Sequence, residues 1–395
     1  MHALDHTDEK LLLDFPPEYT DRVATPCYLL SEDVIARNCA ILAEVQQRTG
    51  AKILLALKAF ALPALFPLIA QSLHGVCASG PIEARMGREE FGREVHTYAP
   101  AYTPSQMERV IRYSDHILFN SIGQWRQHLA AVLQSGRKIE IGLRVNPGHS
   151  EVAIDLYNPC LPGSRFGISP NDLKGVDLTG IDGLHFHAMC EQNADVLVRV
   201  LASFEKLFGK YLPQLKWVNF GGGHHITRDD YDLDLLCETI TGFRRRHGNI
   251  EIYLEPGEAV VLNSGVFVTT VLDTIRHGKN IAILDCSAET HMPDVLAMPY
   301  RPHIIGAGSP GELPHTSGLG GISCLAGDMF GDYSFPNPLK IGDRLVLCDM
   351  ALYSFVKNTS FNGVELPSIY SFSRQRETLT LIRKFGYSDY RSRLA

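Results

Sequence analysis

The sequence predicts an α/β protein in which a (β/α)8 barrel is followed by a mostly antiparallel β domain. From Lys52 to Leu254, short apolar runs alternate with helical stretches, as they do where helices cover a parallel sheet. After Gly257, β-like runs are separated by glycine and proline turns with little helix between them. A doubly wound sheet gives a similar alternation, but eight strands with helical connections fit the barrel.

The first elements precede this alternation. A Pro-Pro pair at residues 16 and 17 interrupts any early helix, so we expect a loose lead-in there. Thr25–Leu30 is a short strand that can also join the β domain, and Ser31 is an N-cap for a helix towards Arg48. The expected division of the chain is a lead-in over residues 1–24, the barrel over 25–264 and the β domain over 265–395.

Buried strands and amphipathic helices are expected in a regular order along the barrel. The strands are Ile53–Leu57, Gly75–Ala78, Val95–Tyr98, Ile117–Phe119, Ile139–Val145, Gly183–His187, Trp217–Phe220 and Ile250–Leu254. The clearest helices are Ile82–Glu90, Gln124–Gln134, Ala194–Phe208 and Asp232–Arg246. In the β domain, strands are expected at Gly265–Ile275, Ile281–Cys286, Ile322–Leu325, Arg344–Cys348 and Thr378–Phe385.

The composition is that of an ordinary soluble protein, with 45% hydrophobic and 21% charged residues. The net charge of −7 argues against nucleic acid and suits a cationic ligand. The nine cysteines form no CxxC pair, the polar start lacks an export signal, and no apolar run reaches membrane-spanning length. We therefore expect a reduced, cytoplasmic protein that binds neither nucleic acid nor membranes.

Polar and glycine-rich groups gather where the expected barrel strands end, which is the edge where barrel enzymes keep their sites. In chain order they are Lys58, Ser79-Gly80, Glu83, Arg144, His185-Phe-His187, Gly221-Gly-Gly-His-His225 and Glu255-Pro-Gly-Glu258. Taken alone, a lysine at a strand exit is more often a solvated surface group than a reactive amine. The three glycines offer N–H groups to a phosphate, or form only a flexible turn.

Together these groups are what pyridoxal phosphate requires: an amine, an anion cradle, a carboxylate for the ring nitrogen and a flat group over the ring. We assign the carboxylate to Glu255, because a paired glutamate keeps the ring nitrogen protonated and the ring can then accept electrons. A zinc-dependent barrel hydrolase is the alternative, since His185 and His187 share one strand face with further histidines nearby. Its histidine pair would normally lie on the first strand rather than the sixth.

From about Thr25 to near the C-terminus, the chain resembles the fold-type III pyridoxal-phosphate decarboxylases. The resemblance rests on Ala56-Leu-Lys58-Ala, Cys77-Ala-Ser-Gly-Pro-Ile-Glu83, Pro162-Gly-Ser-Arg-Phe-Gly-Ile168, His185-Phe-His187, Asn219-Phe-Gly-Gly-Gly-His-His225, Glu255-Pro-Gly-Glu-Ala259, Glu289-Thr-His-Met-Pro-Asp294, Ser323-Cys-Leu-Ala-Gly-Asp328 and Asp349-Met-Ala-Leu-Tyr353. It implies a barrel with a β domain, pyridoxal phosphate as cofactor, amino-acid decarboxylation, and a homodimer with shared active sites.

The resemblance also implies roles for individual residues. The cofactor contacts are Lys58 at the covalent link, His187 on the ring, Glu255 at the ring nitrogen, Gly222 and Gly223 at the phosphate, and Tyr353 near it. Two residues of the β domain would come from the partner chain. Cys324 would return a proton after carbon dioxide leaves, and Asp328 would contact the substrate.

Two departures from the family pattern bear on the substrate. Many relatives have arginine where this chain has Glu258, and ornithine-type relatives have an acid where it has Val76, so ornithine is not expected. A glutamate is repelled by a phosphate and attracted by an amine. With the acid-rich segment 289–294, this favours a cationic carboxy-polyamine, carboxynorspermidine or carboxyspermidine. The expected amine contacts are Glu258, Asp294, Glu289 and Asp328.

Two other functions stay open at this point. Diaminopimelate decarboxylase acts on a substrate with a distal carboxylate, which requires an arginine, and the acids Glu258 and Asp294 fit a cationic tail better. The second is a barrel protein that binds the cofactor without decarboxylating anything. A full β domain with Cys324 and Tyr353 argues against that function.

Overall fold

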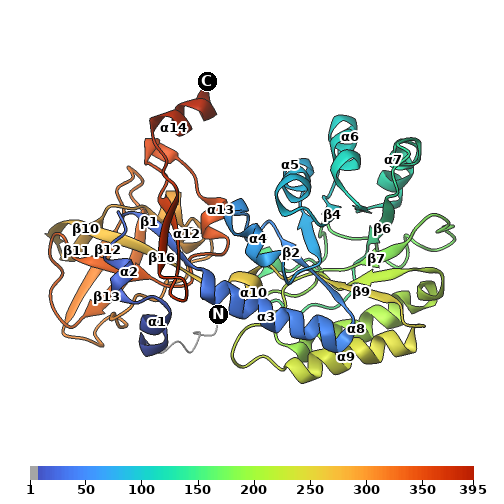
Figure 1. Ribbon diagram of the computed structural model, residues 1–395, viewed down its shortest axis with the longest axis horizontal. Coiled ribbons are helices and arrows are strands. Elements are labelled where there is room, and N and C mark those ends of the chain that lie inside the picture. The colour runs from blue at the N-terminus through green and yellow to red at the C-terminus, as the bar shows by residue number, and fades with distance from the viewer. Residues whose placement is uncertain (1–7) are drawn as a thin grey trace. The chain divides into compact units, whose positions relative to one another are not determined.

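The structure, a computed structural model, describes residues 8–395. Its internal contacts divide the chain into two compact units: Ala36–Val260, and the residues up to Ile35 together with Val261–Ala395. The first unit is a closed barrel with helices and the second is built on an open, mostly antiparallel sheet (Figure 1). The predicted fold class, a (β/α)8 barrel with a mostly antiparallel β domain, is confirmed.

Eight parallel strands close the barrel in sequence order. They are β2 (Lys52–Ala56), β3 (Gly75–Ala78), β4 (Glu94–Tyr98), β5 (His116–Phe119), β6 (Glu140–Arg144), β7 (Gly183–His185), β8 (Trp217–Asn219) and β9 (Glu251–Leu254). The barrel closes where β9 pairs with β2, with Lys52 opposite Tyr253. Every predicted barrel strand is found, with ends shifted by a residue or two.

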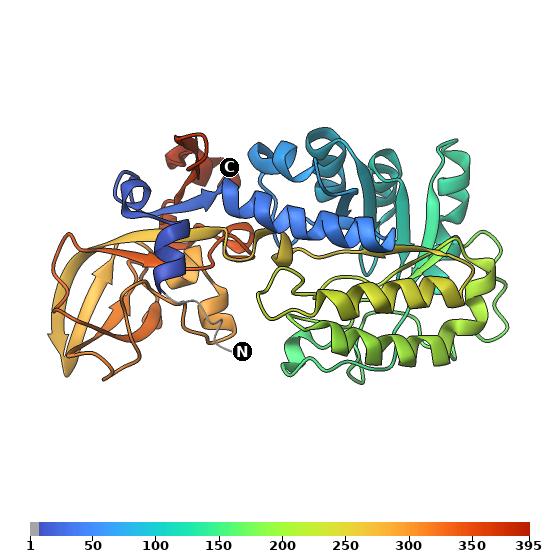
Figure 2. The same ribbon diagram turned by 60° about the horizontal axis from the view of Figure 1, so that its bottom comes forward.

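Helices connect the strands. They are α3 (Glu32–Thr49), α4 (Phe66–Ile69), α5 (Pro81–Met86), α6 (Pro104–Tyr113), α7 (Ile122–Gln134), α8 (Ala194–Phe208), α9 (Leu233–Arg246) and α10 (Glu258–Val261). Helix α8 buries Leu197, Val200 and Phe204, the helical spacing that turns one apolar stripe to the core. Helices α8 and α9 lie side by side (Figures 1 and 2).

The barrel interior is filled around Trp217, which is fully buried. A Cβ atom on Gly142 would lie 2.4 Å from its indole ring, and one on Gly183 would lie 2.1 Å from it. The ring of Tyr253 meets the indole edge-on, with 6.0 Å between centroids. One large side chain from β8 therefore fills the space that β6 and β7 leave open by carrying glycine, which gives a packed core rather than a pore.

The sheet unit has the strand order β13-β12-β11-β10-β1-β15-β16, with β14 paired to β10. Its strands are β1 (Cys27–Ser31), β10 (Gly265–His277), β11 (Lys279–Leu284), β12 (His315–Gly320), β13 (Met329–Phe335), β14 (Arg344–Leu347), β15 (Ser368–Ser373) and β16 (Thr378–Arg383). Pairing is antiparallel except between β1 and β15 and between β11 and β12. Its helices are α1 (Asp8–Asp14), α2 (Pro17–Thr20), α11 (Ala288–His291), α12 (Asp294–Ala297), α13 (Ser354–Lys357) and α14 (Tyr387–Leu394).

The segment before residue 25 differs from the expected loose lead-in; residues 1–7 lie outside the described part. Pro17 occupies the first turn of α2, where proline starts a helix instead of interrupting one. Side chains of α1 and α2 join the core of the sheet unit, and Tyr19 stacks on Phe372 with 4.5 Å between ring centroids. The segment is thus held by apolar burial that its proline pair did not reveal.

The predicted strand Ile322–Leu325 is wrong: these residues form the loop between β12 and β13. Strands β12, β13 and β15 were not predicted, because their glycine, serine and histidine content hides the alternation of polar and apolar residues that marks a strand. This loop carries Cys324, and its irregular backbone leaves the cysteine exposed.

Candidate active site

Lys58 lies in the turn after β2 and is exposed. The backbone around it is fixed, since Leu57 N–H donates to Cys77 O at 3.1 Å and Ala59 N–H donates to Ala56 O at 3.0 Å. Burial lowers the pKa of His187 well below its usual value, and the positive charge of Lys58 adds to this effect. The side chain of Lys58 therefore lies near His187, at the carboxyl-terminal end of the barrel strands.

Glu255 follows β9 and uses both carboxylate oxygens. Asn219 Nδ2 donates to Oε1 at 2.7 Å, and His185 Nε2 lies 3.2 Å from Oε2. Burial alone would raise the pKa of Glu255, but His185, the nearby His96 and the Asn219 amide together lower it to about 2. Glu255 is a carboxylate that stays ionised although its side chain is only 12% exposed.

His187 is held in one tautomer by the glycine run. Gly222 N–H donates to His187 Nδ1 at 2.9 Å, so the ring proton must lie on Nε2 when the ring is neutral. Arg144 donates to the carbonyl oxygen of His187 at 3.3 Å, and its guanidinium lies against the rings of both Tyr98 and Phe166, 4.6 and 4.4 Å from their centroids. These contacts fix a flat, uncharged imidazole at the strand ends.

The glycine run has no space for side chains. A Cβ atom on Gly222 would lie 2.4 Å from Glu255 O, and one on Gly223 would lie 2.0 Å from Met189 O. Gly221 and Gly223 have φ of +71° and +86°, which other residues rarely adopt. The Gly222 N–H is taken by His187, whereas Gly223 N–H has no partner among residues 8–395 and is the donor left for an anion.

Replacing Gly222 by alanine tests this packing. We expect the free energy of unfolding to fall by about 1–3 kcal/mol, because the new methyl group overlaps a carbonyl oxygen. The control is Gly209→Ala, where a Cβ would meet nothing within 4 Å and φ is −54°. Urea unfolding of both variants without cofactor measures the difference, and equal stabilities would contradict the geometry.

Glu258 is the second acid at this end of the barrel and is 11% exposed. It begins α10, and its Oε2 lies 3.2 Å from His225 Nε2. Burial raises the pKa of the nearby Glu191, and the negative charge of Glu258 raises it further. Glu191 has a φ of +53°. Glu83 lies near Lys58, and its Oε2 accepts a hydrogen bond from Ser79 N–H at 2.6 Å. Burial raises the pKa of Glu83, and the Ser79 hydrogen bonds and the charge of Lys58 oppose that rise.

In the sheet unit, Asp328 holds the loop that carries Cys324. Asp328 is 3% exposed and accepts hydrogen bonds from the N–H groups of Ala288 and Ser323 at 2.7 and 3.0 Å. The N–H of Cys324 donates to Asn362 Oδ1 at 2.7 Å, and its side chain is exposed. The carboxylate of Asp328 is thus occupied inside the fold, while the thiol is open to solvent.

The other predicted residues of the sheet unit lie at its short helices. Asp294 forms an ion pair with Lys357, and Glu289 lies half-buried in α11. Tyr353 precedes α13 with φ of +47°, a strained conformation for a bulky residue and one that often marks a functional position. Asn219 and Lys357 are partners that the sequence analysis assigned no role, and Asn219 stands in the same quoted motif as His225.

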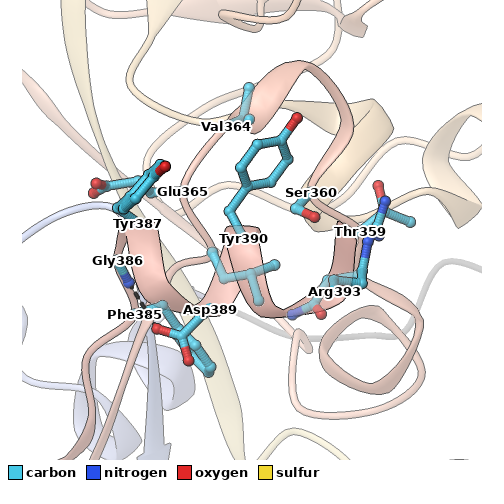
Figure 3. A pocket seen from close by; sticks show the side chains of 13 residues that line it. Thr359, Ser360, Val364, Glu365, Phe385, Gly386, Tyr387, Asp389, Tyr390 and Arg393 are labelled. Atoms are coloured by element: carbon cyan, nitrogen blue, oxygen red, sulfur yellow. Dashed lines mark hydrogen bonds between the residues drawn. The ribbon is translucent and has the colours of Figure 1, made fainter. Parts of the chain in front are cut away.

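The hollow in Figure 3 contains none of the predicted site residues. It lies between the segments 358–366 and 385–393 and has a volume of about 240 Å³. Two acids line it, Glu365 and Asp389. Asp389 already accepts hydrogen bonds from Arg383 at 2.7 Å and Gly386 N–H at 2.9 Å. Because the predicted amine, carboxylate and glycine run all lie elsewhere, we keep the candidate site at the barrel strand ends.

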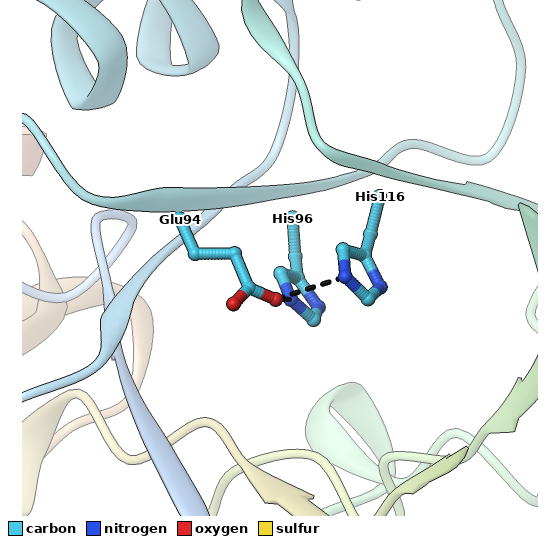
Figure 4. Close-up of side chains that lie close together, drawn as sticks. All are labelled: Glu94, His96 and His116. Atoms are coloured by element: carbon cyan, nitrogen blue, oxygen red, sulfur yellow. Dashed lines mark hydrogen bonds and ion pairs between the residues drawn. The ribbon is translucent and has the colours of Figure 1, made fainter. Parts of the chain in front are cut away.

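A second group of titratable residues, Glu94, His96 and His116, lies together in the barrel (Figure 4). Glu94 begins β4 and His116 begins β5, so the group lies at the opposite, amino-terminal end of the barrel. Glu94 Oε1 lies 2.7 Å from His96 Nε2 and 2.8 Å from His116 Nε2. The two imidazoles stack with 3.8 Å between centroids and 10° between planes. A metal ion must lie near the plane of each imidazole that binds it, and two stacked parallel planes share no such point. The group is a hydrogen-bonded network around one carboxylate.

This network predicts loss of stability in acid. Burial, with the charge of His116 adding to it, lowers the pKa of His96 to about 4, below its value of 6.5 in an unfolded chain. Between these pH values only the unfolded chain takes up the proton, so the free energy of unfolding falls as the pH falls from 6.5 to 4. His96→Gln keeps a donor for Glu94 without titrating, and it should remove about 3 kcal/mol of that fall. Urea unfolding of both proteins between pH 6.5 and 4 measures this difference. The same dependence of unfolding free energy on pH in the variant and the wild type would contradict the prediction.

The residues at the carboxyl ends of the strands fit pyridoxal phosphate. The exposed amine of Lys58, the ionised carboxylate of Glu255, the neutral ring of His187 and the free N–H of Gly223 supply the four chemical functions that the cofactor needs. Of the histidine pair proposed for the alternative zinc site, His185 Nε2 lies against Glu255, and His187 Nδ1 accepts a hydrogen bond from Gly222 N–H.

The model of the family described as "Pyridoxal-dependent decarboxylase, C-terminal sheet domain" matches residues 27–351. The chain belongs to this family of pyridoxal-phosphate-dependent carboxy-lyases. It is 44% identical to carboxyaminopropylagmatine decarboxylase of Synechocystis sp., over 94% of this chain and 95% of that one. It is 42% identical to carboxynorspermidine/carboxyspermidine decarboxylase of Campylobacter jejuni, over 94% and 99% of the two chains.

A solved structure supports the same relationship. The crystal structure of carboxynorspermidine decarboxylase from Campylobacter jejuni, complexed with norspermidine, matches with a TM-score of 0.87 and 41% identity. The match covers 94% of this chain and 100% of that one. In the part of the chain that the structure describes, no helix is long and apolar enough to cross a membrane.

Proposed function

We propose that this enzyme removes the α-carboxylate of carboxynorspermidine or carboxyspermidine and so forms norspermidine or spermidine. The chemistry is supported mainly by Glu255, a largely buried carboxylate that two hydrogen-bond partners keep ionised, at the same end of the barrel as Lys58. The similarity to decarboxylases of these two substrates supports the choice of substrate.

In this proposal, the barrel residues bind and orient the cofactor. When bound, pyridoxal phosphate supplies the electron sink for the charge that the departing carboxylate leaves behind. Lys58 would hold the cofactor and later carry a proton to the product amine. Glu255 would keep a proton at the ring nitrogen, and His187 would offer its flat neutral ring. Gly222 and Gly223 would shape the phosphate site, with Tyr353 near it.

Cys324 is the proposed donor of the proton that replaces the carboxylate. Its thiol is exposed, and the backbone around it is fixed because Ser323 N–H donates to Asp328 and Cys324 N–H donates to Asn362. Because Asp328 is buried and already accepts these backbone donors, we assign it the role of holding this loop instead of contacting substrate. This revises the role that the resemblance implied for Asp328.

The acids Glu258 and Asp294 are the proposed contacts for the substrate's distal amines, with Glu289 as a further contact. Glu258 now faces His225, and Asp294 faces Lys357. Each acid is therefore already paired with a basic group that a substrate ammonium can replace. Such an exchange avoids leaving a buried charge without a partner, which is the costly step in binding ions.

Carboxyaminopropylagmatine is the second candidate substrate, because the decarboxylase that acts on it is 44% identical to this chain. Its name describes a tail that ends in a guanidinium group where carboxyspermidine ends in an ammonium group. A guanidinium binds a carboxylate through two parallel hydrogen bonds, whereas an ammonium acts as a compact point charge. The two tails therefore place different demands on the acids of the distal pocket.

The test is the rate of carbon dioxide release from a panel of substrates. We expect the highest kcat/KM for either carboxynorspermidine or carboxyspermidine. The kcat/KM for the other of these two should be lower by no more than about 10–200-fold, since the two substrates differ by one methylene. Carboxyaminopropylagmatine and diaminopimelate complete the panel. A preference for the guanidinium substrate would replace the first candidate by the second, and a preference for diaminopimelate would overturn both.

We further propose a homodimer in which Lys58 of one chain and Cys324 of the other form one site. Inactive Lys58→Ala and Cys324→Ala proteins, mixed under proven subunit exchange, should recover up to about a quarter of the wild-type activity, because half of the dimers carry one complete site. The matched control is Lys58→Ala with Glu255→Gln, which share a barrel and should recover nothing. No recovery in the first mixture would contradict the shared site.

A cytoplasmic location completes the proposal. All nine cysteines are free thiols in the structure, the state that a reducing compartment maintains. Fractionation of cells that express the tagged protein tests this, and recovery in an exported fraction would contradict it.

A further inference from the structure

We propose that Asn219 and His185 are positioning residues that act through Glu255, fixing its carboxylate and preserving its negative charge for the ring nitrogen of the cofactor. The inference deepens the proposed function and rests on it. Neither residue is assigned a role by the similarity to known proteins. Both are buried, with Asn219 0% and His185 2% exposed.

Asn219 connects two parts of the candidate site through one amide group. Its Nδ2 donates to Glu255 Oε1 at 2.7 Å, and its Oδ1 accepts from Gly221 N–H at 2.8 Å. Gly221 is itself held in place, since its carbonyl oxygen accepts a hydrogen bond from Glu255 N–H at 2.8 Å. It also packs closely, because a Cβ there would lie 2.3 Å from Phe186 O. The glycine run thus fixes the orientation of the Asn219 amide, and that amide in turn fixes the position of the Glu255 carboxylate.

His185 fixes the other oxygen of the carboxylate. Its Nε2 lies 3.2 Å from Glu255 Oε2, and its Nδ1 is buried without a partner among the described residues. An ionised carboxylate only accepts hydrogen bonds, so the proton of the imidazole must lie on Nε2. Two donors on two different oxygens then set the orientation of the carboxylate plane.

The charge state of His185 decides what Glu255 can do. Burial lowers the pKa of His185, so the ring is neutral near pH 7 and gives a hydrogen bond without a charge. An imidazolium here would neutralise Glu255 and leave a protonated ring nitrogen without its counter-charge. A neutral donor on each oxygen stabilises the ionised carboxylate and leaves its full charge available.

The experiment uses the holoenzyme loaded with pyridoxal phosphate that carries ¹⁵N in its ring. We expect the ¹⁵N shift of the wild type to report a protonated ring nitrogen around neutral pH. In His185→Leu and Asn219→Leu, the ring nitrogen should lose this proton at a lower pH than it does in the wild type. In both variants kcat should fall about 10- to 100-fold with KM little changed, as expected for the loss of a hydrogen bond to a charged group. His185→Gln, which keeps a donor near Nε2, should restore most of the ¹⁵N titration.

The matched control is His128→Leu, the same change at a buried histidine of α7 that is 4% exposed. It should leave the ¹⁵N titration unchanged. Thermal unfolding checks each variant, and Asn219→Ser repeats the test if the leucine variants do not fold. A protonated wild type with unaltered titration in the variants overturns this inference alone. A neutral ring nitrogen in the wild type overturns the role of Glu255 itself, and with it the inference.

Discussion

Replacing Lys58 by alanine should abolish decarboxylation and leave the fold intact. The side chain is exposed in its turn, so its removal opens no cavity in the barrel core. The loss of its proton-transfer role alone should lower kcat about 10²–10⁴-fold, and the covalent hold on the cofactor is lost as well. Carbon dioxide release measures the first effect. Borohydride reduction followed by peptide mapping measures the second, because only the wild type should give a cofactor-labelled peptide at Lys58.

Lys52 is the matched control for Lys58, since it begins the strand that Lys58 follows. Its Nζ forms an ion pair with Glu251 and lies 3.1 Å from the Tyr253 hydroxyl, at the opposite end of the barrel. Lys52→Ala should therefore lower stability and leave kcat unchanged. Methylamine added to Lys58→Ala should restore part of the activity by supplying the missing amine. A Lys58→Ala protein with wild-type activity would rule out the proposed site.

Glu255→Gln should have the second-largest effect, a fall in kcat of about 10²–10³-fold. The amide cannot carry the negative charge that would keep the ring nitrogen protonated. The NH2 group of the glutamine must also face one of two hydrogen-bond donors, His185 or Asn219, and so one hydrogen bond is lost. The free energy of unfolding should therefore fall by about 1–3 kcal/mol. Steady-state kinetics and urea unfolding measure the two effects separately.

The control for this change lies on the same strand. Glu251 begins β9, pairs with Lys52 and lies at the other end of the barrel, so Glu251→Gln should leave kcat unchanged. A folded Glu255→Gln protein with wild-type kcat would show that the ring nitrogen needs no carboxylate. Pyridoxal chemistry would then depend on another residue of this barrel.

Much of the barrel is readable from sequence because its strands are short, largely buried runs, and most of them centre on apolar residues. Such runs predicted all eight barrel strands, and the polar residues after them indicated Lys58, His187 and Glu255 as one group. The exact end of β2 was not readable, since Leu57 is as apolar as the strand before it although it lies in the turn. What ends that strand is a backbone turn closed by Ala59 N–H and Ala56 O.

The sheet unit was less readable for a physical reason. Strands such as His315–Gly320 are rich in small and polar residues, and they are held mainly by backbone pairing with their neighbours. The partners of the candidate acids were also hidden. Lys357 and Asp294 are separated by 63 residues, and only the folded chain brings them together. Sequence reasoning finds groups that follow one another at strand ends and misses pairs made across loops.

The packing of Trp217 has a practical consequence for spectroscopy. The chain has two tryptophans, Trp125 and Trp217, and both belong to the barrel unit. Intrinsic tryptophan fluorescence is therefore blind to the sheet unit, whereas circular dichroism records both units. If the two signals change at the same urea concentration, the units unfold as one cooperative body. If they separate, the fluorescence trace alone identifies which transition belongs to the barrel.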